Sequence, residues 1–580
     1  MLKIEEYVSP RPDHPYTNFA HLVDFIANKY TDKDFILYRS GKQREFTRWS
    51  FTRFYEECKR VARGLLAAGL VKGDRVALWA ENRPEWMSVW MGTVIAGIYI
   101  VPIDFLTTET ECLNIIKITK AKAFFYSGKK KSFAGSLASN GVSLSVSVCI
   151  SNEHEDNHDE TEYDKFGRNA GSQVLPPIDS IDPNHPCSIV FTSGTTGFAK
   201  GVTLSHKNII ANASGAIRML DPTPDDIFMD VLPLHHTYPT TCSFIAPLSC
   251  GLSTVIAEKI VGKVVVDDIC DGKVTFLIAV PLLYDKVMAA IDAKYQKLSP
   301  ILRGPLNILR TIALKEAKKG NPEFGRKALR IIRKKANLQS INIMVAGGGA
   351  LSIKTADFFD SLGFNIVHGY GMSENSPLIT VNTPHHKRNE SVGLPISYTD
   401  LKIINPGPDG IGEIACKSPS IMLGYYENEE ATKEVITEDG WLLTGDLGYQ
   451  DSDGYLHIKG RQKNLIVGSG GKNIYPEEVE ANFAGSRSIL EILVVGRNTK
   501  GGEIIFGVMV PNYEFIKLDH PGKENDDAFI FDLIKKEVEE VNRSQPVYKK
   551  IGDFCIRKEA FEKNAQQKIR RFMYKSYENP

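Results

Sequence analysis

The sequence lacks the features that would assign it at once to a secreted or nucleic-acid-binding class. Neither charge is in excess, because 70 Lys and Arg residues balance 70 Asp and Glu residues, so no global field favours nucleic acid as a partner. The amino-terminal residues hold early charges and prolines instead of the apolar run of a secretory signal. We therefore expect a cytoplasmic protein, with peripheral contact at the inner membrane surface left open.

Metal, redox and membrane-spanning motifs are also missing. The nine cysteines form no CxxC pair, which predicts reduced and mostly buried thiols. A formal HExxH pattern at 154–158 lies in a polar segment without an apolar face, so it indicates a solvated loop and not a zinc site. The most apolar stretch, residues 86–101, is shorter than the ~20 residues of a spanning helix, and we expect a buried helix that leads into a strand.

The length and the later sequence patterns predict two domains. With 580 residues the chain exceeds the roughly 250 to 300 at which one core stops growing. From residue 187 onward, β-branched runs end in glycine-rich loops and precede helical patterns, which is typical of parallel sheets covered by helices. Hairpins at 401–417 and 441–461 indicate a β-rich subdomain. We predict an α/β fold, with a large domain at 1–460 and a small, mobile α+β domain at 461–580.

The strongest motif is the loop FTSGTTGFAKG at residues 191–201. It follows an apolar strand and precedes a helix that starts near His206, which predicts the strand, loop and helix arrangement that binds phosphate. Backbone N–H groups, hydroxyls and one lysine of such a loop can converge on a polyphosphate. These residues are Thr192, Ser193, Gly194, Thr195, Thr196, Gly197 and Lys200. The spacing fits neither a Walker A loop nor a GxGxxG dinucleotide motif.

This loop resembles the TSGTTGxPKG signature of the acyl-adenylate-forming superfamily, which includes acyl-CoA synthetases, peptide-synthetase adenylation domains and firefly luciferase. Ala199 stands where that signature usually has proline. Further motifs follow in the family's order from about residue 17 to residue 572. The resemblance implies an enzyme that binds ATP and magnesium and activates a carboxylic acid as its acyl-adenylate.

The segment GYGMSE at 369–374 resembles the family's YGxTE motif, in which the aromatic residue flanks adenine and the glutamate binds magnesium. Magnesium also suits a polyanionic nucleotide on chemical grounds, since it takes one or two carboxylates and keeps phosphate ligands. The resemblance makes Glu374 and Thr196 metal ligands, and Thr192, Lys200 and Glu374 catalytic. The other ATP-binding residues that it implies are Gly347, Gly348, Gly349, His368, Gly369, Tyr370, Gly371, Met372, Ser373, Asp446 and Arg461.

The hinge and a catalytic lysine are implied by two later motifs. The segment GRQKN at 460–464 resembles the hinge of the family, with Lys463 at the pivot where many members have aspartate. The segment at 563–571 resembles PKTxxGKIxR, whose second lysine reaches the reacting carboxylate and the α-phosphate. That role falls to Lys568, while Gln567 stands where glycine is usual.

The acid and its acceptor are implied by resemblance to the long-chain fatty acyl-CoA synthetases. The segments 373–377 and 460–480 and a helical insertion at about 296–338 look like that branch, which implies a fatty acid and coenzyme A as substrates. Within the insertion, residues 324–338 mix basic and apolar side chains, and this favours either contact with a membrane surface or packing on the protein's own core. The residues that would line the acyl pocket are His235, His236 and Tyr238, and those of the CoA channel are Gly470, Gly471 and Lys472.

Three alternatives stay open. The acyl group of the adenylate is passed to an acyl carrier protein, or the adenylate has an oxidative fate as in luciferase. In the third alternative the protein binds acyl-nucleotides without catalysis, because Gln567 disables Lys568.

Overall fold

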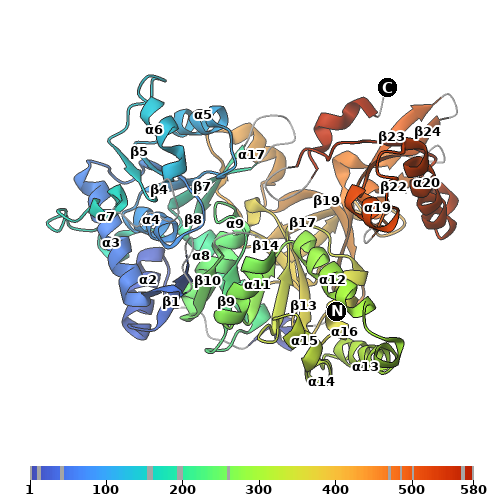
Figure 1. The fold of residues 1–580 in the computed structure, drawn as a ribbon. Coiled ribbons are helices and arrows are strands. Elements are labelled where there is room, and N and C mark those ends of the chain that lie inside the picture. Colours follow the sequence, from blue (N-terminus) through green and yellow to red (C-terminus); the bar gives the residue numbers. More distant parts are fainter. Residues whose placement is uncertain are drawn as a thin grey trace.

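The computed structural model describes residues 3–9, 15–39, 45–152, 161–192, 200–257, 262–467, 472–483, 486–499, 502–563 and 569–577. Within these ranges two mixed sheets and their helices make up the large part of the chain, and the C-terminal residues, orange to red, lie at one end (Figure 1).

The first sheet has nine strands within the described ranges. In spatial order they are β15 (Leu394–Pro395), β14 (Leu378–Val381), β13 (Asn365–Gly371), β12 (Ile343–Ala346), β11 (Phe276–Ala279), β9 (Ile227–Asp230), β10 (Ser253–Ile256), β1 (Asp34–Tyr38) and β2 (Thr47–Ser50). The run from β13 to β1 is parallel and both edges are antiparallel. Strands β10 and β11 are buried along their whole length, as parallel strands covered on both faces should be. The loops that follow β9, β12 and β13 therefore meet at one edge, where ligands bind in such sheets.

The second sheet corrects the prediction for residues 191–201. Its strands are β18 (Gly424–Tyr425), β8 (Lys200–Ser205), β7 (Pro186–Thr192), β4 (Tyr99–Pro102), β3 (Arg75–Trp79), β5 (Ala123–Tyr126) and β6 (Val146–Cys149). Strands β7 and β8 pair in antiparallel fashion up to Thr192 opposite Lys200. The expected strand, loop and helix was thus wrong in its last step, because the loop joins two strands of a hairpin. The strand was missed because only Val202 and Leu204 alternate with polar residues, too short a run to predict a strand.

Helix α8 (His206–Leu220) begins where it was predicted, after β8, and its buried residues belong to two separate hydrophobic clusters. Small residues let it pack closely: a Cβ on Gly215 would lie 2.9 Å from Ile396. The other helices of the large part are α1 (Ile4–Tyr7), α2 (Phe19–Tyr30), α3 (Phe51–Ala67), α4 (Pro84–Ile95), α5 (Glu109–Thr119), α6 (Lys131–Ser136), α7 (Glu162–Lys165), α9 (Thr237–Pro239), α10 (Ala246–Cys250), α11 (Gly262–Asp271), α12 (Pro281–Gln296), α13 (Pro300–Lys318), α14 (Glu323–Ala328), α15 (Arg330–Lys335), α16 (Ile353–Ser361) and α17 (Glu429–Val435).

The predicted hairpins and the α+β pattern after Gly460 are confirmed. Four antiparallel strands form one sheet: β16 (Asp400–Ile404), β17 (Gly412–Lys417), β19 (Leu442–Gln450) and β20 (Leu456–Arg461). The C-terminal elements are β21 (Ile466–Val467), β22 (Asn473–Ile474), α18 (Pro476–Ala481), β23 (Ile489–Thr499), β24 (Gly502–Pro511), α19 (Tyr513–Asp519), α20 (Asp527–Arg543) and β25 (Asp553–Ile556). Two hydrophobic clusters consist of residues from Ile466 onward only. The domain boundary at 460/461 stays a prediction.

Other expectations are also met. The apolar stretch at 86–101 forms α4, buried from Trp86 to Ile95, and then β4. Six of the nine cysteines are buried and none forms a disulfide. The insertion at 296–338 is helical, as α13, α14 and α15. Across the described part of the chain, no helix combines the length and the apolar character that crossing a bilayer requires.

Candidate functional site

A cleft of about 2130 Å³ opens where the two mixed sheets, the antiparallel sheet and the C-terminal part meet. Its walls include the residues after β12 and β13, the loop end of the β7–β8 hairpin, the β19–β20 hairpin, α18 and the segment 569–572. Every predicted site residue that the structure describes lines this cleft, except Lys472. Lys472 is exposed, and its Nζ lies 4.5 Å from the ring centroid of Tyr548.

Eight of the predicted site residues lie outside the described residues: Ser193, Gly194, Thr195, Thr196, Gly197, Gly470, Gly471 and Lys568. The HExxH pattern at 154–158, Ala199 and Gln567 lie outside them too.

One wall of the cleft brings together a cation, a hydroxyl donor and a carboxylate. Lys200 starts β8 opposite Thr192, so the hairpin places an ammonium group and a hydroxyl at the same end. The Lys200 Nζ lies 4.7 Å from the ring centroid of Tyr425. The hydroxyl of Tyr425 donates to Glu374 Oε1 over 2.8 Å, and burial followed by the charge of Glu374 raises the pKa of Tyr425, so this hydroxyl stays protonated. Such a wall suits phosphate oxygens and a divalent cation.

A second wall holds a buried carboxylate in one orientation. Tyr370 Oη donates to Asp446 Oδ2 over 2.6 Å, and Arg461 Nε lies 2.7 Å from Asp446 Oδ1. The pairing of Asp446 on β19 with Arg461 on β20 in the strand ladder fixes this arrangement. Burial and the nearby charge of Asp446 raise the pKa of Tyr370, so its hydroxyl remains a donor. The remaining lone pairs of the carboxylate suit two neighbouring hydroxyls, such as those of a ribose.

The glycine loop after β12 leaves room for a flat group. His368 lies 2.9 Å through Nε2 from the carbonyl oxygen of Gly349, and burial lowers the pKa of His368, so a neutral imidazole donates this bond. A Cβ on Gly347 would lie 2.7 Å from the ring of Tyr238, so only glycine fits beside that ring. Gly348 has φ +79°, which glycine adopts without strain.

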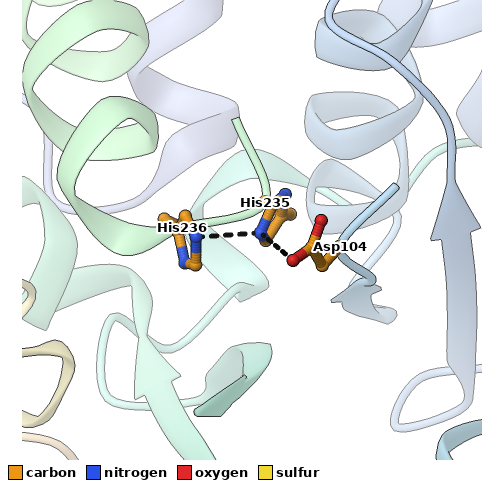
Figure 2. A group of neighbouring side chains, drawn as sticks. All are labelled: Asp104, His235 and His236. Atoms are coloured by element: carbon orange, nitrogen blue, oxygen red, sulfur yellow. Dashed lines mark hydrogen bonds and ion pairs between the residues drawn. The ribbon is translucent and has the colours of Figure 1, made fainter. Parts of the chain in front are cut away.

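Two adjacent histidines and one aspartate converge in the wall of the cleft. His235 Nε2 lies 3.0 Å from His236 Nε2 and 3.6 Å from Asp104 Oδ2, and Figure 2 shows the two rings and the carboxylate meeting from separate elements. Burial lowers the pKa of His235 to about 3 and that of His236 well below its ordinary value, so both rings are neutral at pH 7. Within the described ranges this is the only group of three side chains that could hold a metal ion. The distance between the rings is that of one imidazole donating to the other.

The loop that carries these histidines is held by two residues that the sequence did not reveal. Asn82 Nδ2 donates to Asp230 Oδ2 over 2.8 Å and to the carbonyl oxygen of Leu232, and Leu234 N donates back to Asn82 Oδ1. Burial raises the pKa of Asp230 to about 8. These bonds hold the backbone of the residues that come before His235 in the chain.

The cleft has a group of apolar lining residues on and around α8, which we call the apolar arm. Its residues are Ala216, Ile217, Leu220, Phe228, Cys242, Ala246, Ile278 and Val345. All are buried, and none is charged at pH 7, since burial raises the pKa of Cys242 to about 12. Phe228 and Ile278 precede the carboxyl ends of β9 and β11, so the arm leads from the strand ends into the interior.

The C-terminal wall is held by one partly buried arginine. Arg571 Nη2 pairs with both carboxylate oxygens of Glu480 on α18, and its Nη1 donates to the carbonyl oxygen of Val494 on β23 over 3.0 Å. This contact holds the segment that begins at Ile569 against the small sheet. Lys463 lies in the turn at 462–464 and lines the cleft.

The residues missed by sequence reasoning are those whose partners are far away along the chain. Tyr425 contacts Glu374 across 51 residues and Asn82 contacts Asp230 across 148. A tyrosine after the glycine in LGYY, at 423–426, gave no pattern of its own. Asp104 carried a weaker signal, as a carboxylate just after a buried strand.

Comparison with known proteins agrees with this geometry. Residues 23–426 match the family model described as AMP-binding enzyme. The chain is 26% identical to the putative acyl-CoA synthetase YngI of Bacillus subtilis, over 83% of this chain and 85% of that protein. It is 29% identical to the human long-chain-fatty-acid–CoA ligase ACSBG1, over 81% of this chain and 67% of that protein.

Among solved structures, ATP-bound MatB from Rhodopseudomonas palustris superposes with a TM-score of 0.76 at 22% identity, covering 97% of this chain and 99% of that one. The anthranilate CoA ligase AuaEII with anthranoyl-AMP gives a TM-score of 0.76 at 21% identity, covering 100% and 99% of the two chains. These two likenesses establish the fold. Because the family model spans more than half of the sequence, and because its residues meet in one cleft, the chain belongs to the AMP-binding enzyme family.

Proposed function

We propose that this chain is an AMP-forming acid–CoA ligase whose acid is a long-chain fatty acid. The observation that carries the choice of acid is the uncharged arm along α8, which opens from the same cleft as Lys200, Glu374 and Asp446. An arm without charged groups favours an alkyl chain over a dicarboxylic or amino-substituted acid. The names of YngI and of ACSBG1 support an acyl-CoA product.

In the first step, a carboxylate oxygen of the acid attacks the α-phosphorus of ATP, and the bond to the bridging oxygen of pyrophosphate breaks. The mixed anhydride acyl-AMP and pyrophosphate are formed. Tyr370 flanks the adenine, Asp446 accepts hydrogen bonds from the ribose hydroxyls, and Thr192 and Lys200 bind phosphate oxygens. Lys568 stabilises the charge that builds on the α-phosphate.

In the second step, the thiol sulfur of coenzyme A attacks the acyl carbon, and the bond to AMP breaks. The thiol proton passes to solvent, and the products are the thioester and AMP. The loop with Gly470 and Gly471 lines the path of the pantetheine arm after the small domain has turned about Lys463.

The donor set of the phosphate wall fits magnesium. The Glu374 carboxylate accepts a hydrogen bond from the Tyr425 hydroxyl. Thr237 and Ser373 also line the cleft, and the Thr237 hydroxyl donates to the Ser373 hydroxyl over 3.2 Å. Hard oxygen ligands of this kind are those that magnesium prefers. Glu374, with Thr196, would hold the ion, which neutralises negative charge on the polyphosphate.

Pyrophosphate release tests the proposal. The protein is incubated with ATP and palmitate, octanoate, acetate or benzoate, each with and without coenzyme A, alongside Lys568→Ala. We expect release with palmitate that is stimulated by coenzyme A and falls by a factor of about 100 or more in the variant. Release without stimulation by coenzyme A would point to an acyl carrier protein as acceptor. Absence of release with every acid would refute the ligase proposal.

The apolar arm has a separate test. Ala216→Phe fills the arm with a larger side chain, so we expect the ratio of palmitate to octanoate activity to fall at least tenfold. The ratio is its own control, because a loss of folded protein lowers both activities equally. An unchanged ratio would mean that the alkyl chain does not lie along α8.

A further inference from the structure

The helical insertion carries an excess of basic residues, although basic and acidic residues are equal in number over the whole chain. Between residues 297 and 335 there are 12 Lys and Arg residues and two Glu residues, whereas the whole chain has 70 residues of each sign. Helices α13, α14 and α15 lie together at one edge of the molecule (Figure 1). We name their outward side the insertion surface. Its exposed apolar residues are Ile301, Leu302, Ile308, Ile312 and Ile331, and its exposed basic residues include Lys327, Arg330, Lys334 and Lys335.

Helix α13 turns an apolar stripe to solvent. Ile301 is 85% exposed, Ile308 is 64% exposed and Ile312 is 40% exposed. Their spacing of seven and four residues places them on one side of the helix. The opposite side carries Ala313 and Ala317, which are buried against the neighbouring helices. The exposed stripe therefore contributes nothing to the protein's own core.

The basic and apolar pattern at 324–338, which drew attention in the sequence, is partly satisfied inside the protein. Leu329 and Arg333 are buried, and Arg333 Nη1 donates to the carbonyl oxygen of Gly363 over 2.7 Å. Ile331, in contrast, is 72% exposed. The outward apolar surface thus lies mainly on α13, a helix that the sequence pattern had not singled out.

We infer that the insertion surface docks on an anionic lipid bilayer. Exposed isoleucines on the same helices as exposed lysines and arginines match an interface in which apolar side chains enter the acyl region and cations meet lipid phosphates. A second copy of the same surface is a poor occupant, because two strongly positive faces repel each other. Nucleic acid would use the basic residues and leave the isoleucine stripe without a role. The inference rests on the proposed function only for its purpose, which is to place the enzyme where a long-chain fatty acid dissolves.

Vesicle sedimentation tests the inference without ATP or acid. Wild-type protein is mixed with vesicles of phosphatidylcholine alone and with about 30% phosphatidylglycerol, at ~50 mM and ~500 mM NaCl. Ile301→Ser with Ile308→Ser probes the stripe, and Val174→Ser, at an apolar residue 84% exposed elsewhere, is its control.

A second pair of variants probes the charge. Lys327, Arg330, Lys334 and Lys335 are changed together to Gln. The control changes four exposed lysines on other elements to Gln, so that the net charge alters equally. These lysines are Lys207, Lys263, Lys535 and Lys536.

We expect the wild type to bind the anionic vesicles at low salt, and both test variants to bind at least tenfold more weakly while the controls bind normally. A basic residue near an anionic surface changes the partition coefficient roughly fivefold, so four of them exceed tenfold together. No binding by the wild type would overturn the inference. Full binding by the isoleucine variant would also overturn it, because the surface would then bind polyanions through its basic residues alone. Pyrophosphate release with the soluble acid octanoate should be the same in all variants as in the wild type. Absence of release by the wild type with every acid would refute the ligase proposal and not this one.

Discussion

Tyr370→Phe removes the hydroxyl that orients Asp446. That hydroxyl donates to Asp446 Oδ2 over 2.6 Å, while Arg461 Nε reaches Oδ1 over 2.7 Å. A hydrogen bond to a charged group contributes about 1.5–3 kcal/mol, and losing it leaves a buried acceptor without its donor. Since only 8% of the Asp446 side chain is exposed, water cannot replace the hydroxyl fully. We expect the free energy of unfolding to fall by about 2 kcal/mol.

A double-mutant cycle isolates this bond. Tyr370→Phe, Asp446→Asn and the double variant are unfolded in urea, and the coupling free energy should be about 2 kcal/mol because the two side chains are in contact. Tyr449→Phe, in the same strand, is the control: its recorded contacts are made by the ring, with His457 and Lys459, so its stability should change by less than about 0.5 kcal/mol. ATP affinity, measured by calorimetry, should show the same non-additivity. Additive effects on unfolding would refute the reasoning.

Three further predictions concern other parts of the structure. A Cβ at Gly347 would lie 2.7 Å from the ring of Tyr238, so Gly347→Ala should lower acid-dependent pyrophosphate release at least tenfold, and unchanged kinetics would contradict the close packing. Burial lowers the pKa of His206 to about 3, so on acidification His206 takes up its proton in the unfolded chain before it does so in the folded one. The contribution of this residue to the free energy of unfolding is complete above about pH 6.5 and falls by on the order of 4 kcal/mol toward pH 3. Urea midpoints should therefore fall with pH over this range, and less steeply in His206→Asn. Lys387 Nζ lies 2.5 Å from buried Asp360 Oδ1, so Lys387→Met should cost about 3–5 kcal/mol in urea unfolding, and adding Asp360→Asn should recover part of this loss.

The parts of the fold that the sequence predicted are those with a local cause. The hairpins at 401–417 and 441–461 turn at glycine and aspartate clusters, and the helix at 206–220 has the serine at its N-cap that such helices favour. Strand β8 was missed because its apolar alternation is too short to predict a strand and its partner β7 lies across residues 193–199. Which strands become neighbours depends on contacts that no local pattern records.

The residues of the candidate site were likewise predictable from the sequence only in part. Glycines, hydroxyls and charged residues in motifs were visible because their spacing is local, and those within the described ranges line one cleft, apart from Lys472. Asn82 and Asp230, which hold the loop before His235, could not be found, since 148 residues separate them. The apolar arm was equally hidden, because its residues come from three helical segments, which are α8, 240–245 and α10, and from the three strands β9, β11 and β12.

The contacts across the predicted hinge at 461–464 bear on how one nucleotide site serves two reactions. Lys459 Nζ lies 3.3 Å from Glu478 Oε1 with 26% and 30% of the two side chains exposed, and ion pairs of this kind contribute about 0.2–1 kcal/mol. The stronger contact, between Arg461 and Asp446, belongs to the ladder of β19 and β20 and so lies before the turn. A rotation that begins after Arg461 would break the weak pair between Lys459 and Glu478 and expose both side chains to water. It would leave the Asp446 carboxylate in place. Inter-domain motion is the expected behaviour where the interface is small and polar. We therefore expect the ribose wall to stay intact while the small domain changes which of its faces meets the acyl-adenylate.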